Sequence, residues 1–268
     1  MSQSPKTFNL STLKSIFLVL GAYTFSYCLG LIFHETGHAL AYTIVGVTDI
    51  EIHVHPFELS YCSHGSRPTE VLPFTGSMGP LFNVVCATIV FLSLWRKRNP
   101  KLLPLLMWAG TAYIAEGVAM FIDIAGLPIL TDWGKVIIVG GVSPVIVGIM
   151  GIVFITIGSI FMLLLLPLEN VSHRDLFLRR YLITTSISVY FLLSVIYTSI
   201  FALNVLDNRL IAFFSSIIFS LLLTAIYKPI FPFLDRLSHT EKSPISWSAV
   251  KIACGSALGV IIIVLVFF

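Results

Sequence analysis

Residues 29–42 read LGLIFHETGHALAY and set three ionisable side chains, His34, Glu35 and His38, inside an apolar run. The run extends from near Leu13 to Val45, and about 20 apolar residues are enough for a helix to cross a bilayer. Ionisable residues within such a helix are energetically costly and usually mark a functional site. The stretch therefore predicts a membrane helix that itself carries the site.

The composition agrees with a protein that lies mostly in lipid. Hydrophobic residues make up 57% of the 268 residues and charged residues only 11%, whereas a soluble chain has about 25% charged residues. So small a charged fraction excludes a sizeable soluble domain, and the formal charge of +3 gives no sign of a nucleic-acid partner. We expect an integral, multi-pass membrane protein whose surface contacts the lipid bilayer.

About seven apolar runs are long enough to span a membrane, which predicts an all-α polytopic fold. The expected spans are Leu13–Val45, Phe74–Trp95, Leu102–Leu130, a segment within Val136–Leu166, Tyr181–Leu203, Leu210–Phe231 and Trp247–Phe268. Between the first two spans, Asp49–His55 alternates polar and apolar residues, which is the period of a strand. With a return strand near Leu59–Cys62, this segment predicts a short β-hairpin at the membrane face.

The basic residues are divided unequally between the two sides of this map. Of the 16 lysines and arginines, 13 fall on the side of the amino terminus and three, Arg67, Lys135 and Arg209, fall on the other. Cytoplasmic loops are enriched in lysine and arginine. We therefore expect an odd number of spans with the amino terminus in the cytoplasm.

The motif of His34, Glu35 and His38 has the spacing of a zinc site. Residues four apart on a helix lie on one face, one turn from each other, so both imidazoles can bind one ion. Glu35 follows the first histidine and can act as general base toward a zinc-bound water. The motif predicts zinc as cofactor, with His34 and His38 as ligands and Glu35 as the catalytic residue.

A second element makes the pattern more specific. Residues 79–83 read GPLFN at the start of the second expected span. Together, HETGH and GPLFN resemble the site-2 protease family of intramembrane zinc metalloproteases, and the strand-like loop lies where that family has a membrane-face hairpin. The resemblance covers roughly residues 1–140, which we expect to form the catalytic core, while residues 141–268 add further helices to the same membrane domain.

The resemblance implies a function and further site residues. It implies hydrolysis of peptide bonds in or near the transmembrane segments of membrane-protein substrates. It also implies that Asn83 faces the active site, where its amide could hold a substrate or transition-state carbonyl. The alternative for Asn83 is a hydrogen bond between helices.

The third zinc ligand is open among three acids. The family has an aspartate at this point, and Asp132 follows a proline and opens the fourth expected span as that aspartate does. Asp123 is the alternative third ligand, deeper in the apolar run, and Glu116 lies seven residues before it. The acids that do not bind the metal are expected to orient a ligand histidine or to lie solvated at a helix end.

Two other functions fit parts of the pattern. A membrane metal transporter also carries histidines and acids in its helices, but it would need ligands along a path, and no second span carries a paired motif. A non-catalytic or regulatory relative would keep the fold without cleaving peptides. The intact Glu35 favours the protease over this relative.

Overall fold

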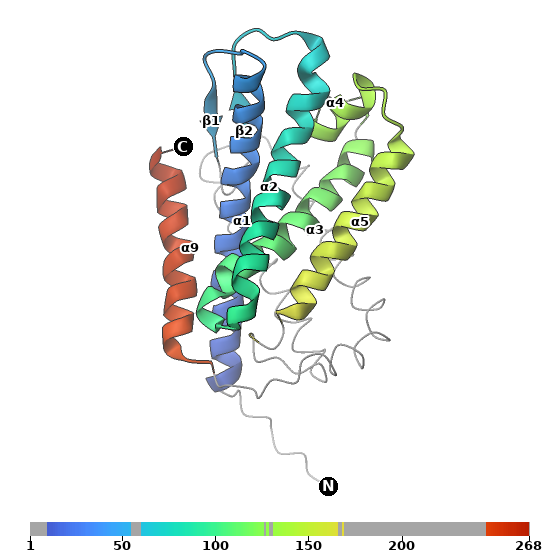
Figure 1. Cartoon of the computed structure of the whole chain (residues 1–268). Coiled ribbons are helices and arrows are strands. Elements are labelled where there is room, and N and C mark those ends of the chain that lie inside the picture. Colours follow the sequence, from blue (N-terminus) through green and yellow to red (C-terminus); the bar gives the residue numbers. More distant parts are fainter. Residues whose placement is uncertain are drawn as a thin grey trace.

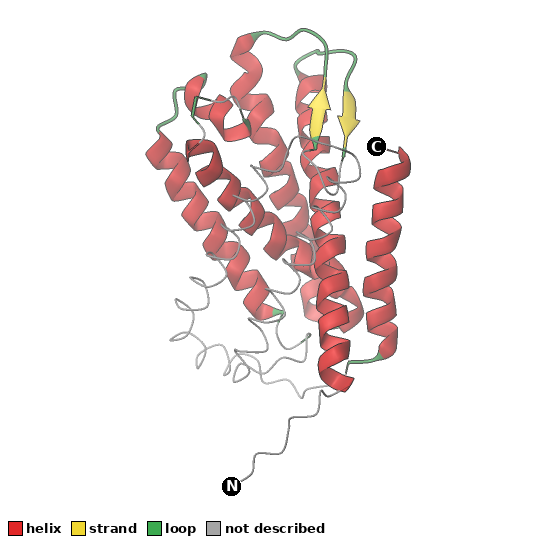
Figure 2. Ribbon diagram, turned by 180° about the vertical axis from the view of Figure 1, so that it is seen from behind, coloured by secondary structure: helices red, strands yellow, loops and turns green. Residues whose placement is uncertain are grey.

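A computed structural model describes residues 10–54, 60–125, 127–128, 131–165, 168 and 245–267 of the chain. This part is mostly helical, with one two-stranded sheet (Figures 1 and 2). Its main elements are α1 (Leu10–Ile44), β1 (Glu51–His53), β2 (Tyr61–Ser63), α2 (Leu72–Leu94), α3 (Leu103–Ala125), α4 (Asp132–Ile138), α5 (Pro144–Leu164) and α9 (Trp247–Phe267). Five of these helices, α1, α2, α3, α5 and α9, are long and apolar enough to cross a membrane.

The apolar runs predicted these five helices at close to their observed bounds. The fourth expected span differs, because its first part is a separate short helix, α4, and the long helix α5 begins only at Pro144. Between them Gly141 has a φ of +66°, a conformation that glycine adopts without steric cost and that ends a helix. The expected spans Tyr181–Leu203 and Leu210–Phe231 lie outside the described residues.

Helix α1 lies between α9 on one side and α2 and α3 on the other, and α5 packs against α3 (Figure 1). A buried cluster of apolar side chains from α1, α2, α3 and α9 joins them, including Leu18, Phe91, Trp108 and Ala253. The division into a core of residues 1–140 and additional helices stays a prediction. Large apolar side chains remain exposed on the outer faces of α2, α5 and α9, as expected where lipid covers a helix.

The structure confirms the hairpin that the alternation in the sequence predicted. Strands β1 and β2 pair antiparallel, with Ile52 opposite Cys62, and they lie beside the carboxyl-terminal end of α1 (Figure 2). The chain turns from α1 toward β1 through Gly46 and Asp49, which both have positive φ angles. Glycine and aspartate are among the residues that tolerate this conformation best.

Helices α1 and α9 cross closely at Gly21. A Cβ atom at this position would lie 2.8 Å from the backbone carbon of Ala253 and 2.8 Å from the backbone nitrogen of Cys254. Backbone atoms cannot rotate away as a side chain can, so any larger residue must push the two helices apart. The contact explains why α9 can lie flat against the helix that carries the histidine motif.

We expect Gly21→Ala to lower the stability of the folded protein by roughly 1–3 kcal/mol, as overpacking typically does. Thermal unfolding of the purified protein in detergent measures the effect. Gly255→Ala is the matched control, because a Cβ at Gly255 in α9 meets nothing within 4 Å. Equal melting temperatures for the two variants would contradict the close crossing.

Candidate metal centre

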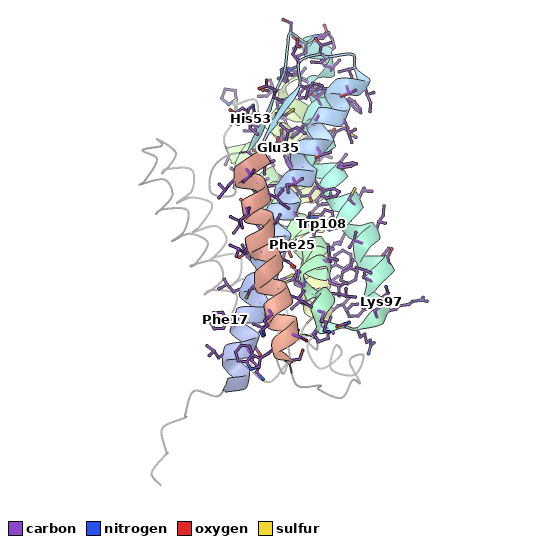
Figure 3. All side chains as sticks on the ribbon, turned by 90° about the vertical axis from the view of Figure 1, so that its left-hand side faces the viewer. Phe17, Phe25, Glu35, His53, Lys97 and Trp108 are labelled. Atoms are coloured by element: carbon purple, nitrogen blue, oxygen red, sulfur yellow. The ribbon has the colours of Figure 1, made fainter. Side chains whose placement is uncertain are left out.

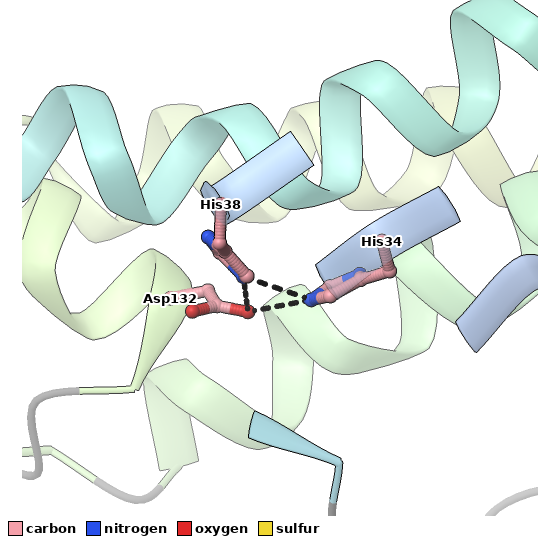
Figure 4. A group of neighbouring side chains, drawn as sticks. All are labelled: His34, His38 and Asp132. Atoms are coloured by element: carbon pink, nitrogen blue, oxygen red, sulfur yellow. Dashed lines mark hydrogen bonds and ion pairs between the residues drawn. The ribbon is translucent and has the colours of Figure 1, made fainter. Parts of the chain in front are cut away.

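Three polar side chains from two helices converge on one point (Figure 4). His34 and His38 come from adjacent turns of α1, and Asp132 is the first residue of α4. The Nε2 atoms of the two histidines are 3.1 Å apart, and Asp132 Oδ2 lies 2.9 Å from His34 Nε2 and 3.2 Å from His38 Nε2. Of the three acids considered from the sequence, Asp132 is the one that joins both histidines.

Both imidazoles are oriented through their other nitrogen atom. His38 Nδ1 donates a hydrogen bond of 2.6 Å to the carbonyl oxygen of Thr75, which can only accept. His34 Nδ1 lies 2.9 Å from Glu116 Oε1, and an ionised carboxylate also only accepts. With a cation between the two Nε2 atoms and Asp132, each neutral ring would carry its proton on Nδ1, and the lone pair of Nε2 would point to the cation.

This donor set fits a tetrahedral metal ion. Two imidazole lone pairs and a carboxylate oxygen face one another, and such acceptors are stable at these distances only when a cation or protons lie between them. Ligands about 2.0–2.1 Å from zinc in a tetrahedron lie roughly 3.3 Å from one another. The three observed separations, 2.9, 3.1 and 3.2 Å, are close to that value.

The local charge also favours a dication. Three carboxylates, Glu35, Glu116 and Asp132, gather around the histidines with one ammonium group, Lys135. When all are ionised, three negative charges and one positive charge leave two negative charges that a divalent cation would balance. Lys135 Nζ lies 3.3 Å from Asp132 Oδ1, so it holds the carboxylate oxygen that faces away from the histidines.

Asp132 is an anion in this setting. Burial alone would raise the pKa of its carboxyl group, but hydrogen bonds from Nε2 of His34 and His38, when these atoms are protonated, hold the pKa well below its usual range. The carboxylate thus stays ionised, so it can accept hydrogen bonds or bind a cation. Asp132 opens a short helix of its own rather than the fourth long span, which corrects the sequence-based expectation.

Glu35 has a buried carboxylate oxygen that lacks a hydrogen-bond partner among the described residues. Its side chain is only 4% exposed, and its Oε2 atom has no hydrogen-bond partner among the described residues. A buried carboxylate oxygen without a partner is unfavourable. A water molecule held in the site would satisfy this oxygen, as the role of a general base requires.

Small residues let the neighbouring helices approach the motif. A Cβ at Gly79 would lie 2.3 Å from His38 Nε2, and a Cβ at Gly37 would lie 2.5 Å from the carbonyl oxygen of Met78. A Cβ at Gly76 would lie 2.6 Å from the carbonyl oxygen of Asp132. The glycines of HETGH and GPLFN therefore create the space in which α1, α2 and α4 meet.

Asn83 is linked to His34 through Glu116 rather than by direct contact with the three converging side chains. Its Nδ2 donates to Glu116 Oε1 at 2.8 Å, and its Oδ1 accepts from Trp108 Nε1 at 2.9 Å. The side chain is 3% exposed. These are hydrogen bonds between helices, as in the alternative drawn from the sequence, while binding of a substrate carbonyl by Asn83 stays a prediction.

Asp123 stays outside the cluster but acts on it. Its Oδ2 accepts a hydrogen bond of 2.9 Å from the backbone nitrogen of Trp133, the second residue of α4. Backbone N–H groups at the start of a helix lack partners within the helix, and an acidic oxygen there stabilises its first turn. Asp123 thus fixes the start of the helix whose first residue is Asp132.

Sequence reasoning missed two residues of the site. Lys135 carried a signal, because it stands three residues after Asp132 in a chain with few charges. Trp108 carried none, since a tryptophan in an apolar helix is most often part of the core. Figure 3 shows Trp108 farther along the helices from His53 of the hairpin than Glu35.

We expect Gly79→Ala to weaken zinc binding, because the added methyl group would displace the His38 ring. Disturbing the orientation of a ligand typically lowers metal affinity about 10- to 100-fold. Zinc retained by the purified protein at increasing chelator concentration measures the change. Gly148→Ala is the control, since its Cβ would make an ordinary contact of 3.7 Å with Ile124; equal zinc retention in both variants would contradict this geometry.

Substitutions at Asp123 separate a helix-capping group from a metal ligand. Asn keeps an oxygen acceptor for the backbone N–H of Trp133, so Asp123→Asn is expected to retain most of the zinc affinity. Ala removes the acceptor, and Asp123→Ala is expected to weaken zinc binding as α4 loses its fixed start, typically by about 1 kcal/mol for a lost cap. If Asn and Ala abolish binding equally, Asp123 acts as a ligand instead.

Comparison with protein-family models, curated proteins and solved structures finds no match to this chain. The arrangement of the residues is therefore the evidence for the function. Their convergence on one point, from helices far apart in the sequence, is the observation on which that argument depends.

Proposed function

We propose that the protein is a membrane-embedded zinc metalloprotease of the site-2 type, which hydrolyses peptide bonds in or near the transmembrane segments of other proteins. The observation that carries the proposal is the meeting of His34 Nε2, His38 Nε2 and Asp132 Oδ2 beside the buried, unpartnered Oε2 of Glu35. A ligand triad that leaves room for a reacting water distinguishes catalytic zinc sites from closed structural ones.

Each residue then has one task. His34, His38 and Asp132 hold the metal, while Lys135 keeps the second oxygen of Asp132 turned away from it. When bound, zinc would act as a Lewis acid that polarises the scissile carbonyl and makes a water molecule more acidic. Glu35 would accept a proton at its free carboxylate oxygen from a water molecule whose oxygen bonds to the carbonyl carbon, and would pass the proton to the amine nitrogen as the C–N bond breaks.

The surroundings of the site suit a substrate that enters from the membrane. The motif is in the apolar helix α1, and the hairpin lies beside the end of that helix. Within the described residues no third strand pairs with β1 or β2, and an extended substrate segment can pair with a free strand edge. Pairing would present an unwound backbone to the site, which a helical substrate cannot do because its peptide bonds are shielded.

The positions of basic residues support an orientation with the amino terminus in the cytoplasm and about seven spans. Figure 1 shows the hairpin and α4 at one end of the helices and the start of α1 at the other. The described basic residues toward the start of α1 are Lys14, Arg96, Lys97, Arg98, Lys101 and Lys251; those at the hairpin end are Arg67 and Lys135. Lysine and arginine mark the cytoplasmic side.

The two other functions have less support. Among the described residues one group of histidines and acids could hold a metal ion, whereas a transporter would need several along a path. A non-catalytic relative would have no use for a buried glutamate oxygen without a partner at the metal site. The protease accounts for both features.

We expect Glu35→Gln to keep its zinc and to lose peptide cleavage, because the amide cannot accept the proton. Removing a general base typically lowers the rate about 10²- to 10⁴-fold. The protein would be reconstituted in liposomes with fusion proteins whose single transmembrane helix contains glycine and proline, and products would be identified by mass spectrometry. Zinc content would be measured on the same samples.

His38→Ala serves as the companion variant, which should lose zinc and activity together. Unchanged cleavage by Glu35→Gln would refute the mechanism. A wild-type protein that binds zinc yet cleaves none of the helices would favour the non-catalytic relative. A wild-type protein that binds no zinc would refute the proposal altogether.

A further inference from the structure

A chain of three hydrogen bonds connects His34 to the interior of the helical bundle. Trp108 Nε1 donates to Asn83 Oδ1 at 2.9 Å, Asn83 Nδ2 donates to Glu116 Oε1 at 2.8 Å, and the same Oε1 lies 2.9 Å from His34 Nδ1. Trp108 and Glu116 belong to α3, Asn83 to α2 and His34 to α1. The chain thus spans three helices.

All the inner members of this chain are shielded from solvent. Trp108 is 2% exposed, Asn83 3% and Glu116 4%. Polar groups buried this deeply must find partners within the protein. Because apolar helices in a bilayer offer few, the few that exist determine one another's orientation.

The directions of the first two bonds in the chain follow from its first member. An indole nitrogen can only donate, so the oxygen of the Asn83 amide must face Trp108. The NH2 group of Asn83 must then face Glu116, which therefore accepts at Oε1. When Glu116 is ionised, its Oε1 can only accept, so it also accepts from His34 and the proton of His34 is on Nδ1.

We propose that Glu116 is a positioning residue for the metal centre, and that Asn83 and Trp108 fix it in the accepting state. The chain holds the His34 ring at one angle and in one tautomer, with the Nε2 lone pair directed at the metal. The inference rests on the proposed function, since it assigns a role relative to that metal. It also gives Asn83 a task other than binding substrate.

The buried charge of Glu116 adds a second effect. A carboxylate that accepts the Nδ1 proton makes the imidazole a stronger electron donor at Nε2. His38 has a neutral carbonyl oxygen, that of Thr75, in the corresponding position. The two histidines are therefore unequal, and His34 is expected to be the more strongly binding ligand.

Cobalt(II) binding tests this role independently of peptide cleavage. Its visible spectrum reports on the ligands, and chelator competition gives the affinity of the full-length protein in detergent. We expect Glu116→Leu to weaken cobalt binding about 10- to 100-fold, as loss of a residue that orients a ligand does. Glu116→Gln keeps an accepting Oε1 without the charge and should lie between Glu116→Leu and wild type.

Trp108→Phe tests the far end of the chain without touching the cluster. Loss of the indole donor lets the Asn83 amide turn over, so cobalt binding should weaken and the spectrum should change. Glu70→Gln is the matched control, because Glu70 is exposed in the short turn before α2, and it should bind as wild type does. Melting temperatures would identify variants that do not fold.

The outcomes separate this inference from the proposed function. If wild type binds no cobalt, the metal centre itself is refuted. If wild type binds cobalt and folded Glu116→Gln and Trp108→Phe bind it with unchanged affinity and spectrum, the positioning role is refuted while the metal centre stands. Where Glu116→Leu does not fold, these two variants decide.

Discussion

The structure depends on the meeting of three electron-pair donors, His34 Nε2, His38 Nε2 and Asp132 Oδ2, within 3.2 Å of one another. Acceptors repel at this distance in a medium of low dielectric constant, so the arrangement is stable only around positive charge. The polar groups that contact His34, His38 and Asp132 hold these three acceptors in place. The apolar helices form the framework, and the three acceptors determine how closely α1 and α4 approach each other.

Each of the three proposed ligands has a hydrogen-bond partner at the atom that faces away from the cluster. Glu116 holds His34, the carbonyl of Thr75 holds His38, and Lys135 holds Asp132. Such partners orient ligands and tune their basicity. Because they come from α3, α2 and α4, the geometry of the site reflects the packing of the whole bundle. Glu35 differs in having an oxygen without a partner, and this is the residue expected to handle a proton.

The long helices, the hairpin and the histidine motif could all be predicted from the sequence. The length of an apolar run predicts a membrane helix, and alternation of polar and apolar residues predicts a strand. A spacing of four residues places His34 and His38 on one face of a helix. Contacts between distant helices could not be predicted in this way, because periodicity gives the face of a helix but not its neighbour. The chain through Asn83 therefore emerged only from the structure, as did the separate helix that begins at Asp132.

In the proposed metal centre, the position of Asp132 would make metal binding and local folding interdependent. Helix α4 has seven residues, and isolated helices of that length are unstable in water. It is held by the carboxylate of Asp123 at its start and by the close approach of Gly76. A metal ion that binds Asp132 only in this folded position stabilises α4 by the free energy of that binding. The two histidines lie on one long helix and need no such help, so Asp132 is the proposed ligand whose position would depend most on a bound metal ion.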